Sequence, residues 1–177
     1  RDVDGMPVAA FALERRVALT YQEFPPQLVP AFISAEDKTF FTHGGLDYPG
    51  IASAILRNWR NRGSDKRPIG ASTITQQVAK TFLLTNEVSI ERKIKEAILA
   101  LRIERTLSKD RILELYLNEI YLGFGSYGVA AAALNYFNKP LDNLTIGEAA
   151  FLAALPKAPN NYNPSSHPEE ARARRDW

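Results

Sequence analysis

The side chains best suited to chemistry in this sequence fall within residues 35–47, AEDKTFFTHGGLD. Glu36 and Asp37 follow an apolar run over residues 28–33, which predicts a short helix with both carboxylates at its C-terminal end. The negative end of a helix dipole disfavours a carboxylate by about 0.3–1 kcal/mol, so helix stability does not explain the pair. We therefore consider both residues as candidate acid–base groups.

Aromatic and imidazole groups follow this acidic pair. Phe40 and Phe41 could cover the carboxylates, and the loss of water would raise the carboxylate pKa. His43 precedes Gly44-Gly45, which places an imidazole on a bend of the backbone. The pattern is typical of a catalytic carboxylate, and equally of a surface acidic pair beside a buried phenylalanine and a hydrogen-bonded histidine.

A second polar group opens the helix predicted within residues 70–80, GASTITQQVAK. Ser72, Gln76 and Lys80 lie four residues apart and therefore share one stripe. Free N–H groups at a helix N-terminus and an ammonium group both favour negative charge, so this stripe predicts an anion site. The alternative is a capped helix with a polar outer face.

A third group lies on the helix predicted from Ser89 to Leu107. Arg92 and Lys93 stand one turn before Glu96, a mixed-charge cluster suited to a pyrophosphate, bare or bridged by metal. A surface ion-pair ladder is the alternative. Glu96 is expected on a second, partly apolar face, because the predicted core stripe of this helix consists of Ile90, Ile94, Ala97, Ile98 and Leu101.

A basic segment follows the helix expected from about Pro49. This helix carries Trp59, and residues 57–67 have a net charge of +4. Apolar surface next to basic surface is how a protein rests on an anionic membrane. An ordinary solvated loop is the alternative.

The rest of the pattern is mostly helical. A helix from near Ser108 is expected to end at Gly123, an alanine-rich helix to cover residues 129–138, and a capping box at residues 145–148 to begin another. Residues 8–12 and 17–21 are weak strand candidates. The sequence thus predicts a mainly α fold with a short, strand-containing N-terminal segment.

Composition restricts the possible classes. A chain of 177 residues, 45% hydrophobic and 24% charged, fits one globular domain, and a formal charge of +2 does not argue for nucleic acid. With no cysteine there is no disulfide or thiol nucleophile, and two histidines argue against a multi-histidine metal site. No apolar run is long enough to span a membrane, and the abrupt ends lead us to expect a fragment of a longer protein.

Four ordered motifs together resemble the glycosyltransferase family 51 domain of class A, bifunctional penicillin-binding proteins and of monofunctional peptidoglycan glycosyltransferases. The resemblance covers essentially the whole chain. Its motifs are Glu36-Asp37-x-x-Phe40-x-x-His43-x-Gly45-x-Asp47, Gly70-Ala71-Ser72-Thr73-Ile74-Thr75-Gln76-Gln77-x-x-Lys80, Arg92-Lys93-x-x-Glu96 and the segment from Lys109 to Gly123.

The resemblance implies a lysozyme-like, mainly helical peptidoglycan glycosyltransferase domain over residues 1–177. Such a domain polymerises lipid II into β-1,4-linked glycan strands, with inversion and release of undecaprenyl pyrophosphate, in bacterial cell-wall biosynthesis. It implies the outer, periplasmic face of the cytoplasmic membrane, with an N-terminal transmembrane anchor in the parent protein. Lipid II, the growing lipid-linked strand and an anionic membrane surface are the implied partners, and moenomycin-type inhibitors are expected to bind.

The resemblance also assigns roles to residues. Glu36 is expected to be the general base, and Glu96 the second catalytic carboxylate, which helps to place the pyrophosphate directly or through a divalent metal, Mg or Mn. No organic cofactor is expected. The donor and pyrophosphate contacts are expected to be Ser72, Thr73, Gln76, Gln77, Lys80, Arg92 and Lys93. The supporting residues are expected to be Asp37, Phe40, His43, Gly45, Asn118 and Tyr121.

Two other functions remain open from the residues alone. A lysozyme-like fold with a catalytic glutamate could belong to a peptidoglycan hydrolase or lytic transglycosylase, although the chain has no Glu-Ser pair and carries cations that a neutral glycan does not need. A non-catalytic module could keep the fold without the reaction. Neither Ser-x-x-Lys nor Lys-Thr-Gly occurs, so we expect no transpeptidase domain and no acylation by β-lactams in this chain.

Overall fold

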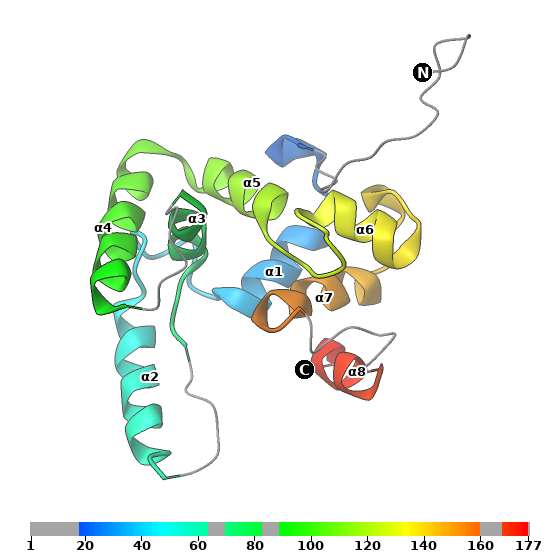
Figure 1. Cartoon of the computed structure of the whole chain (residues 1–177). Coiled ribbons are helices and arrows are strands. Elements are labelled where there is room, and N and C mark those ends of the chain that lie inside the picture. The colour runs from blue at the N-terminus through cyan, green and yellow to red at the C-terminus, as the bar shows by residue number, and fades with distance from the viewer. Residues whose placement is uncertain (1–17, 64–69, 83–88, 160–167, 177) are drawn as a thin grey trace.

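The helices form two lobes in the computed structural model, which describes residues 18–63, 70–82, 89–159 and 168–176 (Figure 1). The first, called here the α2–α4 lobe, contains α2 (Tyr48–Arg60), α3 (Ile74–Phe82) and α4 (Ile90–Thr106). The second, the α1–α7 lobe, contains α1 (Leu28–Glu36), α5 (Lys109–Glu119), α6 (Val129–Phe137), α7 (Ile146–Ala154) and α8 (Pro168–Asp176). Three short 3-10 helices complete the described chain: η1 (Tyr21–Glu23), η2 (Leu141–Asn143) and η3 (Leu155–Lys157).

Helix α5 joins the lobes, because it packs against α3 and α4 on one side and against α6 and η1 on the other. Helices α1 and α8 both pack against α7. Phe32 of α1 is fully buried and meets Tyr116 of α5 edge to face, with ring centroids 6.1 Å apart. One hydrophobic core therefore runs through α1, α3, α5, α6 and α7. It fixes the end of α1, where Glu36 stands, between the lobes.

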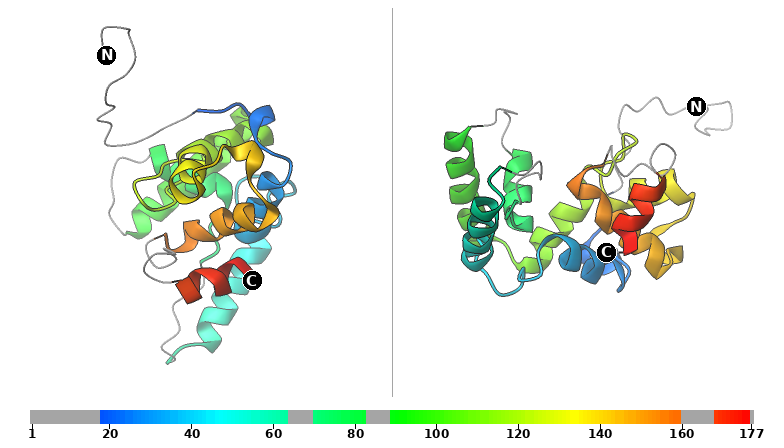
Figure 2. Two further views of the ribbon diagram at one scale, coloured as in Figure 1. Left: turned by 90° about the vertical axis from the view of Figure 1, so that its right-hand side faces the viewer. Right: turned by 90° about the horizontal axis from the view of Figure 1, so that it is seen from below.

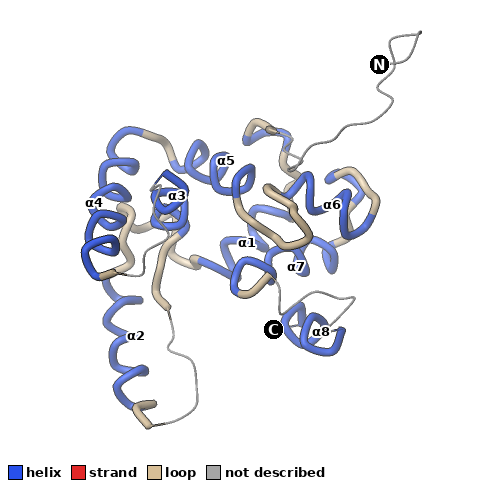
Figure 3. Tube along the Cα trace, in the orientation of Figure 1, coloured by secondary structure: helices blue, strands red, loops and turns tan. Residues whose placement is uncertain are grey.

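The mainly helical prediction is confirmed, since the described residues contain no strand and only one isolated bridge, between Tyr121 and Tyr127 (Figure 3). The capping box predicted at residues 145–148 is present. Ser89 caps α4 by accepting a hydrogen bond from the Arg92 N–H. Of the two strand candidates, residues 8–12 lie outside the described residues, and the described part of 17–21 leads into η1 instead of a strand.

The predicted core face of α4 is wrong. Ile90, Ile94 and Ile98 are 83%, 55% and 47% exposed, whereas Glu96, Ala100 and Ile103 are buried. The reason is a close approach of the backbone: a Cβ atom at Gly45 would lie 3.0 Å from the Ala100 carbonyl oxygen. Small residues allow this packing, so the face with alanine and glutamate turns inward, and the face with three isoleucines remains at the surface.

Helix α5 ends four residues before the expected glycine stop. Its C-cap is Ile120, and the chain then bends so that the Gly128 N–H donates to the Ile120 carbonyl over 2.9 Å. Tyr121 therefore lies in the loop between α5 and α6 and not on α5 itself.

Large apolar side chains are exposed on the α2–α4 lobe. On α2 they are Tyr48, Ile55, Leu56 and Trp59, of which Trp59 is 66% exposed. Arg57, Arg60 and Arg62 lie on the same helix and just beyond its end. Across the ranges that the structure describes, no helix is both long and apolar enough to cross a membrane.

Candidate active site

Glu36 stands at the last position of α1 and forms part of the wall of two neighbouring pockets. Its Oε2 accepts a hydrogen bond from the Gln77 side-chain amide on α3, over 2.9 Å. The carboxylate is only partly buried. The Glu36 carboxylate at the end of α1 is thus accessible from both pockets, and Gln77 of the α2–α4 lobe orients it.

One of these, called here the cationic pocket, has a volume of about 430 Å³. Lys80 reaches it from α3, and Arg92, Lys93 and Glu96 reach it from α4. Ser72, Gln76 and Gln77 also line it. The structure therefore brings together the second and third sequence groups, which the sequence could only treat as separate stripes.

Lys93 contacts two other residues that line the cationic pocket. Its ammonium group contacts Glu96 Oε1 and donates to the Ser72 hydroxyl over 2.8 Å. The Glu96 side chain is 4% exposed, whereas that of Lys93 is 53% exposed. A buried carboxylate is stable only with such a partner, so the pair holds Glu96 in place while the outer part of Lys93 remains accessible.

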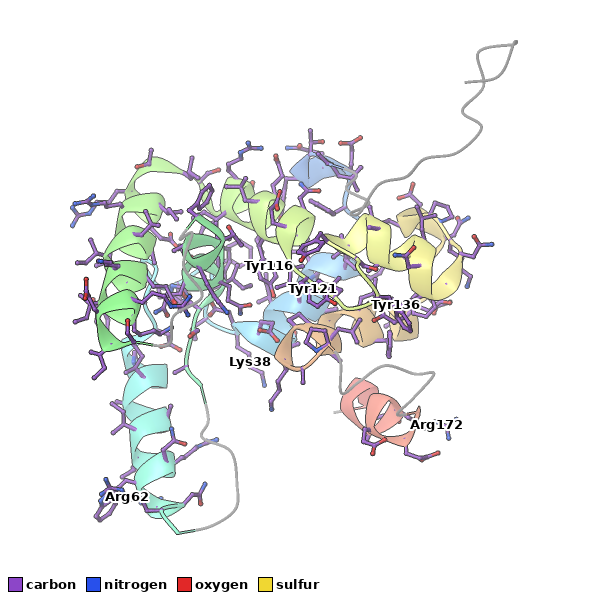
Figure 4. The ribbon with its side chains drawn as sticks, in the orientation of Figure 1. Lys38, Arg62, Tyr116, Tyr121, Tyr136 and Arg172 are labelled. Atoms are coloured by element: carbon purple, nitrogen blue, oxygen red, sulfur yellow. The ribbon has the colours of Figure 1, made fainter. Side chains whose placement is uncertain are left out.

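The second pocket, called here the α2-side pocket, has a volume of about 330 Å³. Glu36 and Ser72 line it as well, and Lys38 and Arg57 add positive charge from the first motif and from α2. Figure 4 places Lys38 beside the end of α1. Glu36 is therefore positioned to act on a group that lies between two ligands, one in each pocket.

Asp37 has a different environment from its neighbour. It is 6% exposed, and both carboxylate oxygens accept from His43 Nε2, at 3.0 and 2.9 Å. Because the Gly45 N–H donates to His43 Nδ1 over 3.1 Å, the ring carries its proton on Nε2. Asp37 also accepts the Ile74 N–H over 2.9 Å. Asp37 and His43 thus fix the first motif to the start of α3.

The start of α3 is capped from within the protein. The Thr73 hydroxyl accepts from the Gln76 N–H, and the Gln76 side chain accepts from the Thr73 N–H, each over 3.1 Å. This is a capping box, which the sequence analysis missed although Thr-x-x-Gln is its signature. Because Asp37 accepts from the Ile74 N–H as well, the N–H groups at the start of α3 are occupied by side chains of the protein. The expected anion site at this helix end is therefore not open. The anion-binding character of this region comes from the lysine and arginine side chains.

Thr73 and Gly45 join the first two motifs, since the Thr73 hydroxyl donates to the Gly45 carbonyl over 2.6 Å. Phe40 is fully buried, but Phe41 is 54% exposed and does not cover the carboxylates as expected. Asn118 bonds the Leu19 backbone through its side-chain oxygen and nitrogen, at 2.9 and 2.7 Å. These contacts hold the N-terminal segment on α5, outside the cationic pocket.

Two lysines to which the sequence analysis gave no role belong to this region. Lys109 donates to the His43 carbonyl and to Glu104, each over 2.7 Å, and its ammonium lies 4.3 Å from the centre of the Phe40 ring. Lys157 of η3 lines the cationic pocket from the α1–α7 lobe. Lys109 could have been noticed within the fourth motif, whereas only the fold brings Lys157 to the pocket.

The pKa of Tyr116 reflects its burial and the charges of the acidic pair. Burial, followed by the negative charges of Glu36 and Asp37, raises the pKa of Tyr116 well above 10. Its hydroxyl is buried and has no hydrogen-bond partner within the described part of the protein. The charge of Glu36 therefore acts on a buried hydroxyl that has no hydrogen-bond partner among the described residues.

A metal at this site would need ligands from outside the protein. In the parts of the chain that are described, no three His, Asp or Glu side chains are grouped to hold an ion. Mg²⁺ is commonly bound by one or two carboxylates together with substrate phosphates. Glu96 therefore fits a metal only as one ligand beside phosphate oxygens.

Comparison with known proteins agrees with this geometry. The sequence pattern of a family described as Transglycosylase matches residues 4–177. Penicillin-binding protein 1A of Rickettsia prowazekii (strain Madrid E) is 54% identical over 174 residues, which are 98% of this chain and 22% of that protein. Penicillin-binding protein 1A of Aquifex aeolicus (strain VF5) is 47% identical over 175 residues, 99% of this chain and 24% of that protein.

A solved structure shares the fold. The 2.6 Å crystal structure of penicillin-binding protein 1A from Haemophilus influenzae is 27% identical, covers 93% of this chain and 14% of that chain, and superposes with a TM-score of 0.50. The chain spans less than a quarter of the length of these relatives. Because the family pattern extends over nearly all of its residues, the chain belongs to the transglycosylase family and is a peptidoglycan glycosyltransferase domain.

Proposed function

We propose that this domain transfers the glycan of one lipid-linked substrate to the sugar hydroxyl of another, so that lipid II is polymerised into β-1,4-linked strands and undecaprenyl pyrophosphate is released. The observation that carries the proposal is the position of Glu36 between two pockets, one of them lined by three cations from α3 and α4. The cationic pocket takes the donor, the pyrophosphate-linked strand. The α2-side pocket takes the acceptor, lipid II.

Glu36 is the general base in this mechanism. The Glu36 carboxylate accepts the proton of the acceptor 4-hydroxyl while the hydroxyl oxygen forms a bond to the anomeric carbon of the donor. The Gln77 amide, which donates to Glu36 Oε2, keeps the carboxylate in one orientation. Attack from the α2-side pocket on a donor in the cationic pocket inverts the anomeric centre in a single displacement, without a covalent intermediate.

The leaving group determines the role of the cations. The bond between the anomeric carbon and the phosphate oxygen breaks as the new bond forms, and its electron pair leaves with the pyrophosphate. Lys80, Arg92 and Lys93 stabilise this negative charge, and Lys157 adds positive charge from the opposite lobe. Glu96 is the positioning carboxylate, because it holds Lys93 in the pocket.

We propose one way in which a divalent metal, Mg or Mn, could bind at this site. Glu96 and the pyrophosphate oxygens would hold it, and it would supply further positive charge to the leaving group. Phosphoglycolipid inhibitors of the moenomycin type present a phosphate to the same pocket and are expected to bind there.

The surface of the α2–α4 lobe supports a location at the membrane. The exposed apolar side chains of α2 lie beside Arg57, Arg60 and Arg62, as in proteins that rest on anionic lipid. A substrate with a polyprenyl tail requires such proximity. We therefore place the domain on the outer face of the bacterial cytoplasmic membrane, within a longer protein that carries a transmembrane anchor.

The test is turnover of lipid II by the domain and by a Glu36→Gln variant, in detergent and in vesicles, with glycan strands and undecaprenyl pyrophosphate measured together. General-base catalysis contributes about 10²–10⁴-fold, so the variant is expected to lose at least a hundredfold in rate while it still binds moenomycin. Glu91→Gln on the outer face of α4, where Glu91 pairs with Lys95, is the control. Activity of Glu36→Gln within about tenfold of the unmodified domain would exclude Glu36 as the base.

A further inference from the structure

An ion pair between α4 and α5 lies outside both pockets. Lys109, the first residue of α5, contacts Glu104 of α4, with 2.7 Å between the ammonium nitrogen and Oε1. The Glu104 side chain is 8% exposed and that of Lys109 is 23% exposed. Neither residue is in the wall of the cationic pocket or of the α2-side pocket. The pair is therefore largely shielded from water and is not placed to bind the substrate.

The carboxylate of this pair connects several segments that approach the site. Besides the lysine, Glu104 Oε1 accepts a hydrogen bond from the Thr75 hydroxyl of α3, over 2.5 Å. The stem of Glu104 also packs on the first motif, since a Cβ atom on Gly45 would lie 3.1 Å from the Glu104 Cγ atom. Helices α3, α4 and α5 and the loop of the first motif thus meet at one side chain.

Lys109 extends this contact to the loop that follows Glu36. Its ammonium donates to the His43 carbonyl over 2.7 Å and lies 4.3 Å from the centre of the Phe40 ring. In the right-hand view of Figure 2, the start of α5 lies next to the segment that links α1 to α2. The His43 ring in turn bonds the Asp37 carboxylate, over 2.9 Å. A continuous line of contacts therefore runs from α5 to the residue next to Glu36.

Stability alone does not explain a charged pair at this place. Replacing a buried ion pair by apolar residues of similar volume is often neutral or stabilising, because the desolvation of two charges offsets their attraction. An apolar side chain, however, cannot donate a hydrogen bond to the His43 carbonyl. The pair selects one arrangement of the loop, since Glu104 fixes the ammonium of Lys109 and the ammonium fixes the backbone at His43.

The transfer reaction depends on the arrangement that this pair holds. Glu36 is the last residue of α1, and Asp37 is the C-cap of that helix. The cations of the donor pocket, among them Lys80 and Lys93, are on α3 and α4. A displacement of about 1 Å between reacting groups can cost about a hundredfold in rate. A contact that ties the loop after Glu36 to α3 and α4 therefore helps to set the distance that bond formation requires.

We infer that Lys109 is a positioning residue for the transfer reaction. Through the His43 carbonyl it holds Asp37, and with it Glu36, at a fixed place relative to the cations of α3 and α4. Glu104 keeps the ammonium of Lys109 in place. This inference rests on the proposed function, because it takes Glu36 as the base. Lys109 touches no substrate, so its loss lowers the turnover number kcat and leaves donor binding unchanged.

The test separates folding from positioning. Lys109→Met alone leaves Glu104 buried without its partner and is expected to lower the melting temperature. The double variant Lys109→Met with Glu104→Gln removes both charges, keeps an apolar stem over Phe40, and leaves an amide oxygen that can accept from Thr75. We expect the double variant to regain the melting temperature of the unmodified domain. Its kcat on lipid II is expected to stay about ten- to hundredfold low, with KM and moenomycin affinity within about threefold.

A proton resonance of His43 reports the loop without any need for activity. The Nε2–H group bonds the Asp37 carboxylate, and the His43 side chain is 8% exposed, so this proton is expected to exchange slowly with water. We expect its NMR signal in the unmodified domain, and broadening or loss of the signal in the double variant at the same pH and temperature. The chain has two histidines, so the signal that persists in His167→Gln belongs to His43.

The matched control is Lys139→Met with Glu148→Gln, which removes another ion pair of 2.7 Å, in the α1–α7 lobe. The inference is overturned if the double variant at Lys109 recovers kcat together with its stability, if it fails to regain stability, if its His43 signal is unchanged, or if the control loses as much kcat. Should Glu36→Gln keep its activity, the proposed base is wrong. The His43 signal then still tests whether Lys109 holds the loop.

Discussion

Glu36 and Asp37 are adjacent in sequence but do different work. Asp37 is buried and bonded to His43 and to the start of α3, whereas Glu36 is partly exposed between two pockets with one oxygen held by Gln77. The sequence indicated that the pair was the candidate site. It could not show which carboxylate is structural, because that depends on the position of α3. The Ile74 N–H at the start of α3, which donates to Asp37, is thirty-seven residues later in the chain.

The buried hydroxyl of Tyr116 allows a test at the scale of one atom. Removing an unsatisfied buried polar group relieves its desolvation cost, so Tyr116→Phe is expected to leave the free energy of unfolding unchanged or to raise it by about 1 kcal/mol. Urea unfolding at neutral pH measures this difference. A decrease of more than about 1 kcal/mol would mean that the hydroxyl has a partner, such as an ordered water.

The same variant has a pH signature. The pKa of Tyr116 is raised in the folded state, so the unfolded phenol loses its proton first as the pH rises above 10, and the unfolded state is favoured there. The stability contribution is fully present below pH 10 and is lost above it. In Tyr116→Phe, the free energy of unfolding is therefore expected to decrease less steeply with pH in the alkaline range.

At the scale of the elements, helix boundaries and caps were largely predictable, but the faces of the helices were not. Ser89 and Thr145 cap α4 and α7 as the local sequence predicts. The orientation of α4 was wrong because three isoleucines outweigh alanine and glutamate in any pattern of hydrophobicity. Only the close contact of Gly45 with Ala100 shows that the small residues face inward.

The Thr73 hydroxyl allows a test of the junction between the first motif and α3. Thr73→Val keeps the side-chain shape but removes the N-cap of α3 and the bond to the Gly45 carbonyl. We expect a loss of about 1–3 kcal/mol in the free energy of unfolding, measured with urea. Thr81→Val is the control, since that hydroxyl bonds only within α3, to the Val78 carbonyl. Equal losses in the two variants would contradict a special role for the junction.

At the scale of the whole molecule, the site exists only where the two lobes meet. Helix α1 brings Glu36, α3 and α4 bring the cations, and η3 brings Lys157 from the opposite wall. The sequence motifs named most of these residues, and the resemblance connected them to one reaction. Tertiary packing determines which distant segments form the pocket walls, and it also turns the isoleucines of α4 outward. Neither feature can be predicted from a local sequence pattern.

The basic end of α2 allows a test of membrane association. Reversing Arg60 and Arg62 together to glutamate is expected to weaken binding to vesicles of phosphatidylglycerol by more than tenfold, because each basic residue near an anionic surface contributes about 1 kcal/mol. Arg102→Glu with Arg105→Glu, on α4, is the control of equal charge. Sedimentation with vesicles measures the effect. If both double variants lose binding equally, total charge accounts for the attraction.

The exposure of Trp59 on α2 makes the domain a reporter of its own depth in lipid. The chain contains two tryptophans, so replacing Trp177 by phenylalanine leaves one indole. That indole, of Trp59, is one of the exposed apolar side chains of α2 that we place against the membrane. Fluorescence emission from this indole would move to shorter wavelength as α2 enters the interface, and lipids brominated at different carbons would quench it according to depth. Docking and catalysis could then be followed in one cuvette without an attached dye.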